Sequence, residues 1–497
     1  MIPSSPSERE GDAALGRMRG WLIAFAIVQR VAYWLESTSL PFMGAPLFDS
    51  AVYLRQAEAI RSGRFDDVTL VAFSPLYGWF LALFGDGAML AQLALGVASA
   101  VLVERIARRH SPRAGLIAMA LWLGYSLTLF YETKIMSETL GIFLLLGALA
   151  LMYQPGARPS RILAGGAVLG LAVLARANLL FALPFFVLAM LVAREDREGW
   201  RPRALRTGAL ALGIALVLGA NGLWNLAWFD RFVPVILPSR TASLASASGE
   251  WTGSLAIFQT SDAPPGAWDV VEQAEITLGR VAPPAASEPS PAVTSIDLGG
   301  VLRSAPSKLA RTFSDVETTF EYGFYGERTE LASLRWQPIS FATLLVLGLL
   351  GAILLARARG WRALIAHAPL VIGVILVTTL FHPSSRYRLP MIVPLVMLGG
   401  IGLAELWSLP ARRARIAIGS AVLVVCAALA IRHWTHALHD PAMWHVRVAE
   451  GETVRGDTDA ARARVTRAYE LSREGDAART RIELLRRARA LPPPPPP

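Results

Sequence analysis

Residues 339–356, ISFATLLVLGLLGAILLA, contain no charged side chain and run directly into the basic segment RARGWR at 357–362. A helix needs about 20 mainly apolar residues to cross about 30 Å of hydrocarbon, because only hydrogen bonds within the helix satisfy its backbone there. The stretch therefore predicts a membrane-spanning helix whose carboxyl end meets a basic interface.

The same pattern recurs along the chain. Of the 497 residues, 54% are hydrophobic and only 17% are charged, which describes lipid-embedded helices rather than a series of soluble domains. We expect an all-α polytopic membrane protein with about eleven transmembrane helices. The predicted spans lie near residues 20–37, 87–106, 114–131, 135–153, 161–175, 178–193, 206–227, 339–356, 367–382, 388–407 and 415–433.

The arginines give the expected orientation. They cluster in every second connection between the spans, at Arg105 to Arg113, Arg158 and Arg161, Arg194 to Arg206, Arg357 to Arg362, and Arg412 to Arg415. Short basic connections stay in the cytoplasm, so the outer loops 38–73 and 229–336 are expected to face outside. The net charge of +10 follows from the same arginines and predicts no nucleic-acid partner.

Two regions follow from this organisation. Residues 1–433 form the predicted membrane domain, which includes both outer loops, and residues 434–497 form a predicted helical tail. Within the long outer loop, apolar residues at nearly helical spacing predict an amphipathic interfacial helix after Pro306.

The tail predicts a helical hairpin between Asp457 and Ala490 that is broken at Gly475, and it ends in a run of prolines with polyproline II character. Cys426 is the single cysteine, so the sequence holds neither an internal disulfide nor a zinc-type cysteine cluster.

The first outer loop carries the most enzyme-like pattern. In PLFDSAVYLRQAEAIRSG (46–63), a short helix is expected to begin near Asp49 and to stop at Gly63. Tyr53 and Ile60 share one face of this helix, which predicts an interfacial helix lying along the membrane surface. Asp49 has two interpretations. It could be a helix cap that accepts backbone N–H bonds, or a general base held at the membrane face.

Several segments, in this order, resemble the GT-C membrane glycosyltransferases, in particular the bacterial relatives of the protein O-mannosyltransferases and of the lipid A aminoarabinose transferase. The resemblance covers the chain up to about residue 410. It rests on Asp49 with Tyr53 four residues later, SPLYGWFLALFG (74–85), the pair Ser137 and Glu138, LARANLLFALP (174–184), ASGEWTGSLAIF (247–258) and RYRLPMIVPL (386–395).

The resemblance implies a bundle of the GT-C type in a bacterial cytoplasmic (inner) membrane, with its active site facing outside. It implies transfer of a hexosyl or pentosyl unit, with inversion, from a polyprenyl-phosphate donor to a glycan, lipid or protein acceptor. By the matched motifs, Asp49 is the base, and no cofactor is indicated, although a divalent metal is left open. Arginine suits a leaving phosphate, so the other expected site residues are Arg386, Arg388 and Arg176 for the phosphate, and Tyr53, Glu138 and Tyr387 for support or for the acceptor.

The sequence also departs from the family. Aminoarabinose-transferring relatives have a lysine just before the proline of the first loop, where this chain has Phe73 and Ser74, and relatives often have an acidic residue where this chain has Ser50. Arg386 and its neighbours could instead reach the headgroups from the start of a span, and Glu138 could be a favourable acid at a helix start. The sequence leaves two alternative functions open. One is a transporter or flippase for a lipid-linked sugar, and the other is a polysaccharide polymerase or ligase.

Overall fold

The structure, a computed structural model, describes residues 6–41, 43, 49–154, 156–192, 199–237, 298–317, 323–381, 383–409, 412–434, 441–472, 479 and 482. The described residues form helices and no strand, apart from one isolated parallel bridge between Tyr125 and Ile339. The expected all-α class is therefore confirmed. The segment 247–258, which contributed to the family resemblance, lies outside the described residues.

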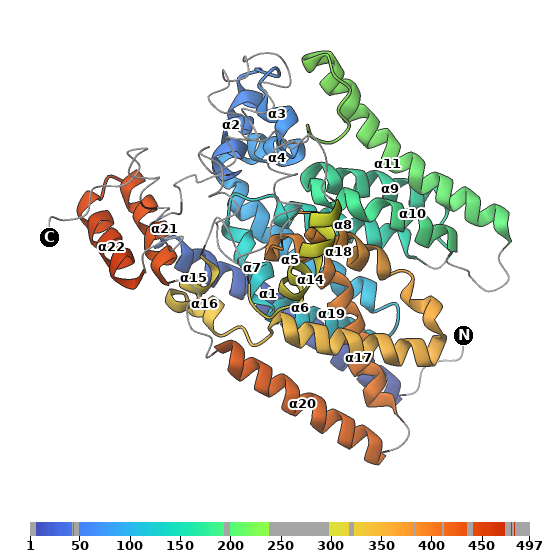
Figure 1. Cartoon of the computed structure of the whole chain (residues 1–497). Coiled ribbons are helices and arrows are strands. Elements are labelled where there is room, and N and C mark those ends of the chain that lie inside the picture. Colours follow the sequence, from blue (N-terminus) through green and yellow to red (C-terminus); the bar gives the residue numbers. More distant parts are fainter. Residues whose placement is uncertain are drawn as a thin grey trace.

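The apolar helices form the bundle in Figure 1. Its members are α1 (Pro6–Ser37), α5 (Ala88–Ala107), α6 (Pro112–Gly124), α8 (Glu138–Met152), α9 (Pro159–Ala175), α10 (Leu183–Val192), α11 (Trp200–Phe229), α17 (Phe341–Arg359), α18 (Ala368–Leu380), α19 (Ser385–Ser408) and α20 (Arg412–Trp434). The shorter elements are α2 (Asp49–Arg61), α3 (Thr69–Ala72), α4 (Pro75–Phe84), α7 (Ser126–Phe130), α14 (Leu298–Thr312), α15 (Phe324–Glu330), α16 (Ala332–Arg335), α21 (Pro441–Val454) and α22 (Thr458–Leu471), with 3₁₀ turns at Gly85–Gly87, Tyr131–Thr133, Ala177–Ala182 and Trp361–Leu364.

Several of these helices have the length and the apolar composition to cross a membrane. Five described segments meet both conditions, namely Pro75–Ala107, Trp200–Phe229, Phe341–Arg359, Ser385–Ser408 and Arg412–Arg432. Shorter apolar helices cover Glu138–Met152, Pro159–Ala175, Ala177–Val192 and Ala368–Leu380. The chain is thus a multi-pass membrane protein. Every predicted span falls on a helix, while the number of eleven crossings stays a prediction.

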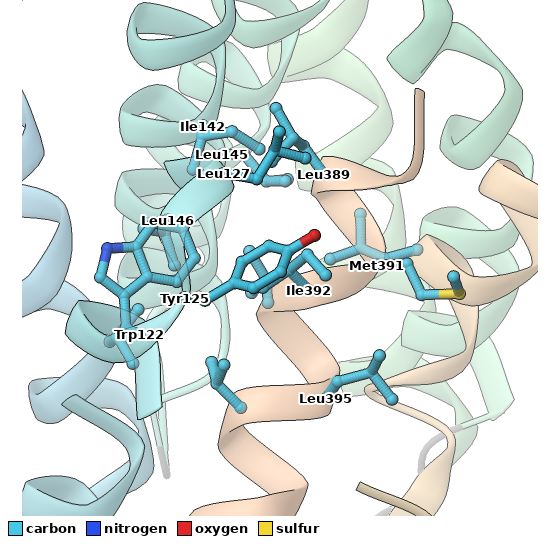
Figure 2. Close-up of a cluster of buried hydrophobic side chains, with 14 of the residues drawn as sticks. Trp122, Tyr125, Leu127, Ile142, Leu145, Leu146, Leu389, Met391, Ile392 and Leu395 are labelled. Carbon is cyan, nitrogen blue, oxygen red and sulfur yellow. The ribbon is translucent and has the colours of Figure 1, made fainter. Parts of the chain in front are cut away.

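The α19 helix is the centre of the bundle, since 83% of its most apolar stretch is buried inside the protein. Glycines let the neighbouring helices approach it closely. A Cβ on Gly402 of α19 would lie 2.5 Å from the Cα of Gly351 on α17, so the two backbones meet at these glycines. Figure 2 shows Tyr125 lying against Leu389 and Ile392 of α19 in the buried core.

The helices of the first outer loop gather at one end of the bundle, where α2, α3 and α4 lie together at the top of Figure 1. The expected helix of this loop is confirmed as α2, and Gly63 follows it with the positive φ of 70° that favours glycine at a helix stop. Tyr53 and Ile60 are both buried, so the face that they share packs inside the protein. The placement of this helix along the membrane surface stays a prediction. Pro75 begins α4 directly after Ser74.

Two expected helices begin elsewhere. The interfacial helix predicted after Pro306 begins at Leu298 and contains Pro306 inside it, so the prediction of its start was wrong. In the tail, the helical pair is α21 with α22, joined at Gly456 (φ 83°), so the hairpin starts well before Asp457. The predicted break at Gly475 lies outside the described residues.

Candidate active site

Asp49 and Arg386 meet at the outer-loop end of the bundle. Asp49 is the first residue of α2, and Arg386 lies in the first turn of α19. The Nη1 of Arg386 lies 2.9 Å from Oδ2 of Asp49, and the two side chains keep 16% and 23% of their surface exposed. This ion pair joins residues 337 positions apart and forms the accessible edge of the site.

Glu138 lies behind this pair and is almost fully buried, with 1% of its side chain exposed. One of its oxygens, Oε1, contacts two guanidinium groups: the Nε of Arg386 at 2.5 Å and the Nη1 of Arg176 at 2.7 Å. Arg176 also donates through Nη2 to the backbone carbonyl of Arg386 at 2.9 Å. A buried carboxylate needs such paired donors to remain charged. Asp49, Arg386, Glu138 and Arg176 thus form one network, which we call the outer charge cluster.

Local sequence places the two inner members of this cluster. Glu138 starts α8 directly after Ser137, and an acid is favourable at that end of a helix. Arg176 follows the last residue of α9 with extended backbone angles (φ −141°, ψ 96°), so it lies in the break before the next 3₁₀ turn. Gly141 leaves room for it, because a Cβ there would come within 2.6 Å of the Cγ and Cδ of Arg176.

The two tyrosines of the predicted site flank the cluster. The hydroxyl of Tyr53 donates to Oγ of Ser137 at 3.4 Å, and its ring packs edge-on against Tyr77 with the ring centroids 4.8 Å apart. Burial, together with the nearby Asp49 charge, raises the pKa of Tyr53 well above its usual value, so its hydroxyl stays protonated. Tyr387 follows Arg386 in the first turn of α19, within electrostatic reach of Asp49.

Arg388 does not join this cluster. Its guanidinium pairs with Glu317, donates to the carbonyls of Thr312 and Ser314, and lies 4.0 Å from the centre of the Phe341 ring. The side chain is only 2% exposed, so these contacts enclose it and anchor the end of the long outer loop to α19. Its expected contact with the donor phosphate stays a prediction, and its surroundings assign it a positioning role instead.

The acidic residues of the first loop also separate by role. Asp67 precedes α3. Its Oδ1 accepts hydrogen bonds from the backbone N–H of Thr69 at 3.0 Å and from the Thr69 hydroxyl at 2.7 Å, and its Oδ2 pairs with Arg55 at 3.0 Å. Although burial acts in the opposite direction, these donors hold the pKa of Asp67 below its usual value. Asp67 is thus a structural carboxylate.

Sequence reasoning missed a second buried network. Lys134 pairs with Glu327 at 2.9 Å, and the hydroxyl of Tyr33 donates to the same carboxylate oxygen at 3.1 Å. Close by in sequence, Glu132 pairs with Arg30 at 2.8 Å. The partners lie on α1, on the segment before α8 and on α15, and no local pattern signals such distant pairs.

No group of three or more His, Cys, Asp or Glu side chains with the geometry of a metal site occurs among the residues that the structure describes. The two carboxylates of the outer charge cluster both face the guanidinium of Arg386.

No protein-family model matches the sequence, and no curated protein matches it. Two solved structures are similar, each with a TM-score of 0.43. The oligosaccharyltransferase of Archaeoglobus fulgidus, tethered to an acceptor peptide, shares 12% identity over 89% of this chain, which spans 58% of its length. The ArnT enzyme of Cupriavidus metallidurans, bound to undecaprenyl phosphate, shares 16% identity over 94% of this chain and 75% of its own. Neither likeness assigns a role to a residue of this chain.

Proposed function

We propose that this protein is an inverting glycosyltransferase that moves a sugar from a polyprenyl-phosphate carrier to an acceptor hydroxyl or amine. The observation that carries the proposal is the Asp49–Arg386 pair, held at the accessible edge of the outer charge cluster by the buried Glu138 and Arg176. A base and a fixed cation at one membrane-facing edge are the two groups that this transfer requires.

In the proposed reaction, the acceptor oxygen or nitrogen attacks the anomeric carbon while the bond from that carbon to the phosphate oxygen breaks. Asp49 takes the proton of the acceptor, and the carrier leaves as polyprenyl phosphate. Arg386 turns part of its guanidinium from Asp49 to the leaving phosphate, where its charge is needed as negative charge develops. Attack opposite to the leaving group inverts the anomeric centre.

Glu138 and Arg176 act through Arg386 rather than on the substrate. The four side chains of the outer charge cluster carry two positive and two negative formal charges, so the cluster is balanced before the donor binds. Glu138 fixes the Nε side of Arg386, which leaves the Nη side to exchange Asp49 for phosphate. Phosphate binding at Arg386 thereby frees Asp49 to act as a base.

The side of the membrane follows from the basic connections. The ends of the helices opposite to Asp49 carry the arginine clusters that mark cytoplasmic loops, so we place the outer charge cluster on the extracytoplasmic face of a bacterial inner membrane. The acceptor is therefore a glycan, lipid or protein of the cell envelope. The undecaprenyl phosphate in the ArnT structure is of the carrier class proposed here.

The test uses the full chain reconstituted in vesicles with a panel of labelled polyprenyl-phosphate sugars and an envelope fraction as the source of acceptor. Release of polyprenyl phosphate reports transfer whichever acceptor is used. Asp49→Asn should lower the rate by about 10²–10⁴-fold, while Asp66→Asn, which changes an exposed acid of the same loop, should leave it unchanged. Normal turnover by Asp49→Asn, or movement of the lipid-linked sugar across the vesicle without any transfer, would overturn the proposal.

A further inference from the structure

A cavity lies at the other end of α8 from the outer charge cluster. The helix begins at Glu138 and its fifteen residues rise about 22 Å along the axis. The cavity there has a volume of about 360 Å³, which falls within the range of roughly 300–1,000 Å³ typical of small-molecule sites. Its walls are mainly apolar and include Ile106, Leu149, Leu355, Leu370, Val393 and Met397.

The permanently charged groups of this cavity are both cations. Arg109 and Arg359 line it together with His110, His367 and Tyr153. Arg109 donates to the carbonyls of Ala150 and Tyr153 at the end of α8, which holds its guanidinium in place, and His110 pairs with Glu405 at 2.6 Å. Both residues follow α5, and these contacts hold them against the end of α8 and against α19.

Arg359 differs from these two residues because it makes no ion pair with any residue that the structure describes. It lies in the last turn of α17 and is exposed. Burial, together with the charges of Arg161 and Arg105, lowers the pKa of Arg109, so positive charge is concentrated around this wall of the cavity. An anion placed between Arg359 and Arg109 would relieve this crowding of like charge.

The surroundings place the cavity mouth at a membrane interface. Trp361 follows α17 directly, is 65% exposed and has Arg362 5.8 Å from the centre of its ring. Exposed Trp and Arg residues are enriched at the headgroup level. On the same helix, Leu349 and Ile353 are also exposed and continue the apolar surface toward the bilayer core.

We infer that this cavity binds a phosphate-bearing membrane lipid, with the phosphate at Arg359 and Arg109 and part of the hydrocarbon chain against the apolar wall. Charge complementarity selects an anionic headgroup over a zwitterionic one. The apolar wall selects a lipid over a free anion, because inorganic phosphate would leave that wall uncovered. The inference is independent of the proposed glycosyl transfer, since the cavity and the outer charge cluster share no lining residue.

The test uses the purified full chain in detergent micelles with a photoreactive phosphatidylglycerol as probe, and the labelled peptides are read by mass spectrometry. Unlabelled phosphatidylglycerol, phosphatidylcholine, polyprenyl phosphate and inorganic phosphate serve as competitors. Arg359→Gln removes the unpaired cation, and Ala363→Trp fills the cavity. Arg357→Gln is the matched control, since it removes an exposed arginine of the same helical turn that does not line the cavity.

The expected result is labelling of peptides around Arg359 that phosphatidylglycerol or polyprenyl phosphate suppresses and phosphatidylcholine does not. Arg359→Gln should weaken binding about tenfold, as for loss of one charge-assisted hydrogen bond, and Arg357→Gln should bind like the unmodified chain. Equal competition by phosphatidylcholine would overturn the inference, as would equal loss in the two arginine variants. Displacement of the probe by inorganic phosphate would assign the cavity to a free anion instead. Arg359 is exposed, so Arg359→Gln is expected to fold and to decide the question even where Ala363→Trp does not.

Discussion

Two glycines of α8 give a sharp test of the outer charge cluster. An alanine at Gly141 would place its Cβ 2.6 Å from Cγ and Cδ of Arg176, and these atoms lie in the middle of the side chain, where they have little freedom to move aside. At Gly147 of the same helix, the nearest atom to an added Cβ is in Val168 at 3.7 Å, which is an ordinary contact. The two substitutions therefore differ in one steric interaction.

The difference in stability between the two variants follows from two opposing contributions. Alanine is favoured over glycine inside a helix by about 1 kcal/mol, and this gain applies to both variants. Overpacking a buried site costs about 1–3 kcal/mol, and it applies only to Gly141→Ala. The displaced Arg176 also loses its 2.7 Å contact with Glu138, so the buried carboxylate is partly unpaired. Gly141→Ala should thus be less stable than Gly147→Ala by at least about 1–3 kcal/mol.

The assay is denaturant unfolding of the full chain in mixed micelles, with transfer activity measured in parallel. Gly147→Ala should unfold at a slightly higher denaturant concentration than the unmodified chain and keep its activity. Gly141→Ala should unfold at a lower concentration and show a raised KM for the donor, because Arg386 loses part of its support. Equal stability and activity in the two variants would refute the described position of Arg176.

Three further predictions concern single side chains. Arg386→Ala should raise the KM for the polyprenyl-phosphate donor by about tenfold or more. Arg388→Ala should mainly lower the free energy of unfolding, by about 3–5 kcal/mol, because Glu317 is left buried and unpaired. Donor kinetics and denaturant unfolding of both variants separate the two roles, and a donor defect without destabilisation in Arg388→Ala would contradict the positioning role of Arg388. The pKa of Asp67 is depressed in the folded protein, so its contribution to stability is present above its unfolded pKa and is lost as the pH falls through the folded value. Asp67→Asn should therefore weaken the dependence of the unfolding free energy on pH in that acidic range. An unchanged dependence would show that the Thr69 and Arg55 contacts contribute nothing. Tyr53→Phe should leave the pH profile of transfer unchanged near neutrality, because a tyrosine with a raised pKa stays protonated there, and a shifted profile would make Tyr53 a proton donor or acceptor.

Continuous apolar runs were sufficient to predict where the helices of the bundle lie, because each run is a local feature of the sequence with polar residues at its ends. The start of α2 at Asp49, its stop at Gly63 and the start of α4 at Pro75 were equally accessible, since caps and stops depend on a few neighbouring residues. The start of α14 was not accessible in the same way. Proline most often stands in the first turn of a helix, whereas Pro306 lies in the interior of α14.

The sequence names the members of the candidate site but not their contacts. Motifs predict Asp49, Glu138, Arg176 and Arg386 as site residues, and their roles stay predictions. The structure brings all four together through pairs that join Arg386 to residues 337 and 248 positions away, and only tertiary packing determines which carboxylate meets which guanidinium. Arg388 shows the same limit. It lies two residues from Arg386, and on a helix side chains two apart face different directions, so the motif alone could not separate their roles.

The position of Arg386 also bears on why the cluster suits an anion. It lies in the first turn of α19, where the helix dipole disfavours a cation. Asp49 and Glu138 lie at the starts of α2 and α8, where the dipole favours them, and their charges offset the unfavourable position of Arg386. Three helix starts therefore converge on one guanidinium. Under the proposed function, a phosphate at Arg386 is stabilised by the guanidinium and by these positive helix ends. The negative charge that develops on it as the sugar leaves then favours uptake of the acceptor proton by Asp49, because protonation removes the neighbouring negative charge. The proposal thus couples proton transfer to the departure of the phosphate in one reaction step.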